Sequence, residues 1–222
     1  RDMTVNFMIA GRDTTACALS WTVYELCKHP EVEAKLVAEI QDCVPIVEKL
    51  SYDDLAQCHY LTAVVHEALR LHPSVAFDPK HALVDDVLPG SGARIKAGQA
   101  VAYVPFAMAR MPEIWGPDAE EFKPERWMNN DQQEQPQEAQ RHSAPVPTPA
   151  HFVKCSDVYK YPVFQGGPRL CLGIDMALLE LKAVLCALYS SCTFKLQQEP
   201  QILTTVVLQM TPEGLKTKVE RR

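Results

Sequence analysis

Residues 164–173 constrain what this chain can fold into more than any other segment. They read Phe-Gln-Gly-Gly-Pro-Arg-Leu-Cys-Leu-Gly and lead into an apolar helical pattern at about 172–190. Cys171 therefore lies at the start of a helix, where unpaired backbone N–H groups and the helix dipole favour negative charge. Such a position favours the thiolate form of a cysteine, and the same N–H groups can hydrogen-bond a metal-bound sulfur.

The remaining residues of this segment suit a close approach to another group. Gly166 and Gly167 permit a tight turn, and Pro168 stiffens it. Gly173 lets the backbone approach a large, flat partner, and Arg169 offers a fork of donors that suits a carboxylate. The alternative interpretation is an ordinary strand–turn–helix junction with a buried cysteine and a solvated arginine.

The spacing F-x-x-G-x-R-x-C-x-G decides between these interpretations, because it resembles the haem-binding signature of cytochromes P-450. The resemblance implies that Cys171 is the proximal iron ligand of haem b (iron protoporphyrin IX) and that Arg169 is a haem-propionate partner. It also implies that Phe164, Gly167 and Gly173 complete the cofactor-binding loop.

Glu67 and Arg70 lie three residues apart on a predicted helix, so they share a face and can pair. Such a pair alone is usually a surface ion pair. In cytochromes P-450 the pair is buried and is joined by an arginine from a P-E-R-F-like segment. The segment Pro124-Glu-Arg-Trp matches that pattern, with tryptophan in place of the usual phenylalanine. The resemblance implies that Arg126 is the third member of a structural network.

A third motif, Ala10-Gly-Arg-Asp-Thr-Thr, lies in the first predicted helix. Glycine costs ~1 kcal/mol relative to alanine in a helix, and threonine can bond back to a carbonyl one turn earlier. We expect a local opening of the helix there; the alternative is that Asp13 caps a new helix. The motif resembles the distal motif A/G-G-x-D/E-T of the same family. It implies that Asp13 and Thr14 are catalytic and relay protons to dioxygen.

The texture of the sequence predicts a mainly α protein with small β-sheets (α+β), and the resemblance implies the C-terminal half of the cytochrome P-450 fold from its distal helix onward. The chain is then one partial domain, 1–222, in which 1–127 hold the distal helix and the Glu67 helix. Residues 128–160 are a polar insertion that we expect to be flexible. Residues 161–222 hold the cysteine loop, the helix after it and a hairpin. The predicted helices are 4–28, 31–42, a short one from 51, and 60–71; the predicted strands are 99–104, 203–210 and 215–219, the last two forming a hairpin around 212–214.

Charge and hydropathy exclude two classes of protein. The net charge of -6 and a pI near 5.7 do not suggest a nucleic-acid surface. No stretch approaches the ~20 apolar residues that a membrane span needs. The chain opens with Arg-Asp-Met-Thr rather than an initiator methionine, which indicates a fragment. The resemblance implies a parent protein on the cytosolic face of the endoplasmic reticulum membrane, held by an N-terminal anchor absent here.

The eight cysteines include no C-x-x-C pair, and most lie in helical stretches beside apolar residues. This pattern favours buried free thiols in a reducing compartment over a disulfide framework or a zinc site. We therefore assign a structural role to all of them except Cys171.

The implied reaction inserts one oxygen atom of dioxygen into a lipophilic substrate, with electrons from an NADPH-dependent reductase. The residues expected to line the substrate pocket are mostly apolar, which favours such a substrate. Residues 78–89 resemble the fatty-acid ω-hydroxylase branch of the family. The expected pocket residues are Ala10, Val75, Ala76, Phe77 and Met210.

Three alternatives compete with this interpretation. A haem-thiolate isomerase or dehydratase would share the cysteine loop, but such enzymes tend to lack the acid–alcohol pair that Asp13 and Thr14 form. A truncated, non-catalytic haem-binding fragment would also share it. A hydrolytic Cys171 would need His142 or His151 as its base, and both lie in the polar insertion.

Overall fold

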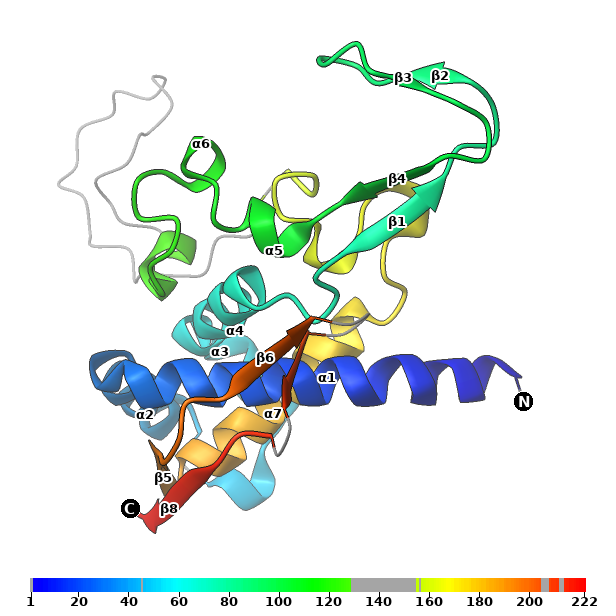
Figure 1. Ribbon diagram of the computed structural model, residues 1–222. Coiled ribbons are helices and arrows are strands. Elements are labelled where there is room, and N and C mark those ends of the chain that lie inside the picture. The colour runs from blue at the N-terminus through cyan, green and yellow to red at the C-terminus, as the bar shows by residue number, and fades with distance from the viewer. Residues whose placement is uncertain (1, 45, 129–154, 156, 205–207, 212–213) are drawn as a thin grey trace, which may run out of the picture.

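The computed structural model describes residues 2–44, 46–128, 155, 157–204, 208–211 and 214–222. Helices dominate, and the strands form four separate two-stranded antiparallel sheets (Figure 1). The expected α+β class is therefore confirmed. The helices are α1 (Asp2–Lys28), α2 (Pro30–Cys43), α3 (Tyr52–Gln57), α4 (His59–Leu71), α5 (Pro105–Met108), α6 (Pro112–Trp115) and α7 (Ile174–Tyr189). Short 3-10 turns are η1 (Val47–Lys49), η2 (Pro124–Trp127), η3 (Pro162–Phe164) and η4 (Gly167–Arg169).

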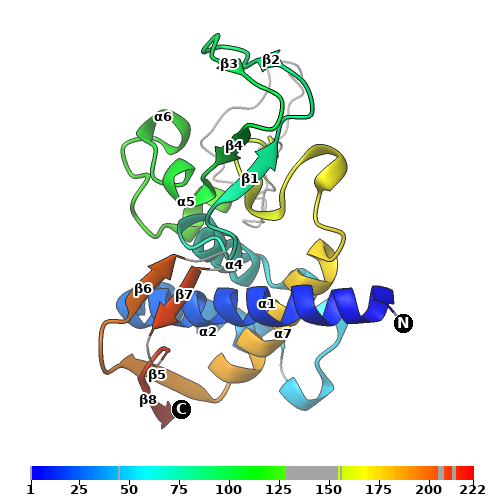
Figure 2. The same cartoon turned by 45° about the vertical axis from the view of Figure 1, so that its right-hand side comes forward.

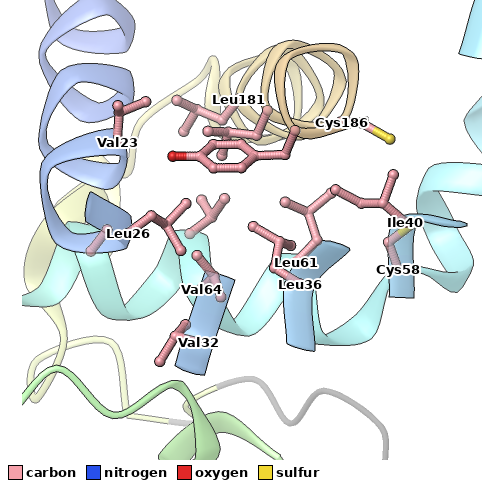
Figure 3. Close-up of a cluster of buried hydrophobic side chains, with 14 of the residues drawn as sticks. Val23, Leu26, Val32, Leu36, Ile40, Cys58, Leu61, Val64, Leu181 and Cys186 are labelled. Carbon is pink, nitrogen blue, oxygen red and sulfur yellow. The ribbon is translucent and has the colours of Figure 1, made fainter. Parts of the chain in front are cut away.

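The core lies where α1, α2, α4 and α7 meet. These helices contribute fully buried side chains such as Leu26, Leu36, Leu61 and Leu185, which Figure 3 shows in part. Burying one such leucine contributes about 1.5–3 kcal/mol. The four helices therefore form the frame on which the rest of the chain is mounted.

The ends of the helices follow local sequence signals. Pro30 occupies the first turn of α2, where its missing N–H costs nothing. Ser51 and Asp54 form a capping box at the start of α3: the Ser51 Oγ accepts a hydrogen bond from the Asp54 N–H at 3.2 Å, and the Asp54 carboxylate accepts one from the Ser51 N–H at 2.9 Å. The capping box expected here is confirmed.

Only the C-terminal half of α1 belongs to the core. Its buried residues run from Ala18 to Leu26, whereas Met3, Val5 and Met8 are exposed. Figure 2 shows the N-terminal half extending beyond the helices that contact the other half. No helix in the described part of the chain combines the length and the apolar character that crossing a bilayer requires.

The sheets lie around this helical frame. Strands β1 (Asp78–His81) and β4 (Ala100–Tyr103) pair, and Asp78 faces Tyr103 in their register. Between them the chain extends outward as the hairpin β2–β3 (Asp86–Val87 and Arg94–Ile95), which Figure 1 shows at the top of the molecule. The remaining strands are β5 (Cys192–Leu196), β6 (Gln201–Thr204), β7 (Leu208–Thr211) and β8 (Thr217–Arg221).

The predicted hairpin around 212–214 is wrong. Strand β7 pairs with the preceding strand β6, and β8 pairs with β5 at the end of α7. The alternation in the sequence marks strands but does not specify their partners: β7 pairs with the strand just before it, and β8 pairs with β5, although β6 and β7 lie between them in the chain. The predicted insertion falls almost entirely outside the described residues.

All eight cysteines are free, as expected, but only Cys58 and Cys186 are buried. The other six are partly exposed, so the expectation of uniformly buried thiols is wrong. Amphipathic packing explains this result, because several of these cysteines lie at the margins of the core rather than inside it.

We predict that Leu185→Ala lowers the free energy of unfolding by about 2–5 kcal/mol, because it opens a cavity among the four core helices. Leu83→Ala is the matched control: Leu83 is 93% exposed, so its removal should change the stability by less than about 0.5 kcal/mol. Urea denaturation followed by circular dichroism measures both. Equal effects of the two substitutions would contradict the assignment of the core.

Candidate functional site

The Cys171 loop is fixed at both of its ends by the core. Phe164 packs against the main hydrophobic cluster at the end of η3, and α7 begins three residues after Cys171. The Cys171 N–H donates to the Phe164 carbonyl oxygen at 2.8 Å, which closes the loop on itself. The Cys171 side chain is partly exposed. A thiol is thus presented at the edge of the frame, before the N-terminus of a helix.

The glycines of this loop permit close contacts that other residues would prevent. A Cβ added to Gly166 would lie 3.1 Å from the Tyr159 ring, which is closer than ordinary packing allows. Gly167 has a φ of +60°, a conformation that favours glycine. A Cβ added to Gly173 would lie 3.7 Å from the Phe7 ring on α1. The loop therefore approaches both the preceding segment and the first helix.

Gln165 has an unusual backbone conformation for a residue with a side chain. Its φ is 68° and its ψ is -173°, and among the described residues it is the one non-glycine with a positive φ. This region of conformational space is almost restricted to glycine and costs about 1–3 kcal/mol for other residues. Sequence reasoning missed Gln165, because the contacts that hold it come from Asp78 and Tyr103, far away in the chain.

Four other cysteines are unsuitable as thiolate ligands. Burial raises the pKa of Cys17, Cys27 and Cys186 to about 11, and the pKa of Cys58 to about 12. These thiols stay protonated near neutral pH, and the thiolate is the form that binds metal. Their environments therefore support the structural role that the sequence suggested for them.

Arg169 lies two residues before Cys171 and its side chain is exposed. Within the described part of the chain its guanidinium has no hydrogen-bond partner. Its fork of donors can therefore reach a carboxylate supplied from outside the protein, such as a propionate.

Arg70 lies at the centre of a buried network. Its side chain is 1% exposed and that of Glu67 is 0% exposed, so both charges are removed from water. All five N–H groups of the guanidinium have acceptors. These are the two carboxylate oxygens of Glu67 at 2.8 and 2.9 Å and the carbonyl oxygens of Ala109, Ala119 and Glu121 at 2.5, 2.7 and 3.0 Å.

The Glu67 carboxylate also accepts hydrogen bonds from residues in and just before η2. Arg126 Nε donates to it at 2.7 Å, the Lys123 backbone N–H at 2.9 Å and Trp127 Nε1 at 2.8 Å. The structure thus brings Glu67, Arg70 and Arg126 together in one network. Trp127 adds a hydrogen bond that phenylalanine could not make, so the departure from the usual residue strengthens the network.

The first helix is unbroken at the distal motif. Helix α1 runs through Gly11 without interruption, and the Thr14 hydroxyl donates to the Ala10 carbonyl oxygen at 2.6 Å. The expected local opening is therefore wrong, as is the alternative of a new helix starting at Asp13. The hydroxyl shares the carbonyl oxygen with the helix ladder instead of displacing it.

Asp13 and Thr14 occupy different environments. Asp13 is half exposed and pairs with Arg12 at 2.7 Å, and this hydrogen bond lowers the pKa of Asp13, so it is ionised near neutral pH. The Thr14 side chain is partly buried, and its carbonyl oxygen accepts a hydrogen bond from Ser74 Oγ at 2.8 Å. Ser74 follows α4, so this bond connects the first helix to the segment that leads to β1.

The structure separates the expected pocket residues. Ala10 and Phe77 are exposed and Val75 is partly buried, so these three can contact a ligand. Ala76 is 3% exposed and packs against Trp21, so its side chain faces the interior, and its assignment to a pocket stays a prediction. Side chains alternate between the two faces of this extended segment, which turns Ala76 inward when Phe77 points outward.

Three predicted residues fall outside this description. The Met210 side chain lies outside the described residues, although its backbone belongs to β7. His142 and His151, the bases that a hydrolytic Cys171 would need, also lie outside them.

Comparison with known proteins identifies the family. The family model "Cytochrome P450" matches residues 1–219. Cytochrome P450 704C1 of Pinus taeda is 37% identical over 239 residues, which cover 100% of this chain and 42% of that protein. Cytochrome P450 94B1 of Arabidopsis thaliana is 37% identical (100% and 41% covered), and cytochrome P450 94A2 of Vicia sativa is 41% identical (84% and 33% covered). This chain belongs to the cytochrome P450 family.

The chain spans about two fifths of the length of the first two of these relatives. The family's cofactor is haem b, and the chemistry of the loop fits it: Cys171 offers a partly exposed sulfur donor, and within the described residues the Arg169 guanidinium has no partner and can bind a propionate. A Cβ at Gly166 would disturb this arrangement.

We predict that Glu67→Gln lowers the free energy of unfolding by about 3–5 kcal/mol, because Arg70 and Arg126 are left as buried charges without a counter-ion. Asp85→Asn is the control, since it breaks the exposed pair with Lys96 and should cost less than about 1 kcal/mol. Chemical denaturation compares the two. A Glu67→Gln protein as stable as the control would show that the network is dispensable.

Proposed function

We propose that the protein to which this chain belongs is a haem-dependent monooxygenase, with Cys171 as the proximal iron ligand. The observation that carries this proposal is the position of Cys171: a partly exposed thiol at the entrance to α7, in a loop closed by the bond from its own N–H to Phe164. The net reaction would insert one atom of dioxygen into a substrate and reduce the other to water. When bound, haem supplies the redox chemistry of that reaction.

The loop residues would hold the cofactor. The positive end of α7 stabilises the negative sulfur of Cys171, and Arg169 would bind a propionate. A Cys171 thiolate would serve as an electron-rich ligand to the haem iron and would tune the redox chemistry that the cofactor supplies. The role of the chain here would be to keep the sulfur of Cys171 at a fixed place before the N-terminus of α7.

Asp13 and Thr14, which lie on α1 rather than on the Cys171 loop, would deliver the protons that the reaction consumes. The Thr14 hydroxyl donates a hydrogen bond to the Ala10 carbonyl oxygen, so the lone pairs of the hydroxyl oxygen are open to accept a hydrogen bond. Asp13 is half exposed and can exchange protons with solvent. The family motif assigns proton delivery to this pair, with the exposed carboxyl group of Asp13 open to solvent and the partly buried hydroxyl of Thr14 as the group that would act as the acid.

We propose a lipophilic substrate, with fatty-acid hydroxylation as the specific reaction. Two features support this: the exposed side chain of Phe77, 49% accessible beside Val75, and the resemblance of residues 78–89 to the fatty-acid ω-hydroxylase branch. Electrons would come from an NADPH-dependent reductase. The complete protein would lie at the cytosolic face of the endoplasmic reticulum membrane.

We predict that Cys171→Ser abolishes the strongly red-shifted Soret band of the ferrous–carbonyl complex, because only thiolate ligation produces that band. Cys192→Ser is the control, since Cys192 is also partly exposed but lies on β5. Absorbance difference spectra of the complete protein measure both. A red-shifted band that persists in Cys171→Ser would remove the assignment of the ligand.

We predict that Thr14→Ala lowers product formation per NADPH consumed by about 10²-fold, the lower range for loss of a general acid. Ser20→Ala is a close control: Ser20 lies on the same helix and donates to Ala16 O at 2.8 Å, the same type of bond as that of Thr14. Turnover with ¹⁸O-labelled dioxygen gives the second test. Unlabelled product would contradict monooxygenation itself.

A further inference from the structure

Gln165 lies where the Cys171 loop changes direction. It follows Phe164, whose carbonyl oxygen accepts the Cys171 N–H, so any change in the Gln165 backbone alters the bond that closes the loop. Its φ of 68° is a conformation in which glycine would be free of steric penalty. The Gln165 backbone N–H donates to the Pro162 carbonyl oxygen at 3.1 Å, and contacts of the Gln165 side chain add a second hold on this strained conformation.

Those contacts come from the β1–β4 sheet. The Tyr103 hydroxyl oxygen lies 2.5 Å from Gln165 Oε1 and 2.5 Å from Asp78 Oδ2, so one phenolic proton serves two acceptors. Lys80 Nζ binds both carboxylate oxygens of Asp78 at 2.7 Å. Because Asp78 and Tyr103 face each other in the β1–β4 register, the sheet presents them as one rigid unit.

The protonation states of Asp78 and Tyr103 fix which group donates and which accepts each hydrogen bond. Burial opposes ionisation of Asp78, but hydrogen bonds from Lys80, Tyr103 and Gln165 outweigh it and lower the pKa of Asp78. Burial and the bond to Asp78 raise the pKa of Tyr103. Near neutral pH the pair is therefore a carboxylate and a neutral phenol, which gives every member a defined role as donor or acceptor.

We propose that Gln165 is a positioning residue for Cys171, held in its left-handed conformation by the Asp78–Tyr103 pair of the sheet. The Gln165 side chain fixes a turn that would be flexible with glycine at this position. The Cys171 sulfur is then held in a single geometry. This inference rests on the proposed function only in naming Cys171 as the iron ligand. The connection between the sheet and the loop is a property of the described chain itself.

Tyr103→Phe and Gln165→Gly test the connection in the complete, haem-loaded protein. Gln165→Gly removes the amide without adding steric strain, because glycine tolerates the positive φ, and Tyr103→Phe removes the contact without the added backbone freedom of glycine. Amide hydrogen exchange of residues 164–172 is the first readout and should accelerate about five- to tenfold in either variant. The fraction of ferrous–carbonyl complex that keeps thiolate ligation is the second, and should fall in both.

Tyr24→Phe is the matched control, because it also removes a tyrosine–carboxylate hydrogen bond, to Glu199 at 2.9 Å, from the other end of α1. It should leave both readouts unchanged. The double variant Tyr103→Phe/Gln165→Gly should behave like Gln165→Gly alone, because the two residues act through one contact.

The outcomes separate this proposal from the proposed function. Unchanged exchange rates and unchanged thiolate ligation in Tyr103→Phe and Gln165→Gly would overturn the positioning role, while the loss of the red-shifted band in Cys171→Ser would still stand. Additive effects in the double variant would also overturn it. Retention of the band in Cys171→Ser would instead overturn the ligand assignment and leave the exchange result to report on the sheet–loop contact alone.

Discussion

The rest of the structure depends on the pairing of one buried carboxylate with two guanidinium groups. Glu67 forms ion pairs with Arg70 and Arg126 in the interior, and removing any one of the three would deprive a buried partner of counter-charge. The network ties α4 to η2 and, through the carbonyl oxygens of Ala109 and Ala119, to the irregular segment between α5 and η2. A segment with little hydrophobic core of its own thereby gains a fixed position against the helical frame.

This frame carries two separate parts of the candidate site. The cysteine loop is mounted on α7, and the acid–alcohol pair is mounted on α1; the two helices are in contact through the core. Phe7 and Gly173 bring the helix and the loop close together. The spacing between the Cys171 sulfur and the Asp13–Thr14 pair is thus set by helix packing rather than by a flexible linker, and packed interiors resist compression.

Local features of the fold could be predicted from the sequence, and features that depend on distant contacts could not. The helices, the capping box at Ser51 and the Glu67–Arg70 pairing follow from spacing within a few residues. The pairing of β8 with β5 and the inward turn of Ala76 do not, because each depends on residues that lie outside the local sequence pattern. The positive φ of Gln165 is the clearest case, since Tyr103 lies 62 positions earlier.

The division of α1 into an anchored and a projecting half makes the helix a lever. A rise of 1.5 Å per residue places Thr14 roughly 6 Å and Met3 roughly 22 Å beyond Ala18, the first buried residue of the helix. A tilt of about 5° would then move Met3 by roughly 2 Å but Thr14 by only about 0.5 Å. The hydrogen bond from Ser74 to the Thr14 carbonyl oxygen places the point about which the helix tilts nearer to Thr14 than Ala18 does. Large swings of the free arm can therefore leave the Thr14 hydroxyl almost stationary.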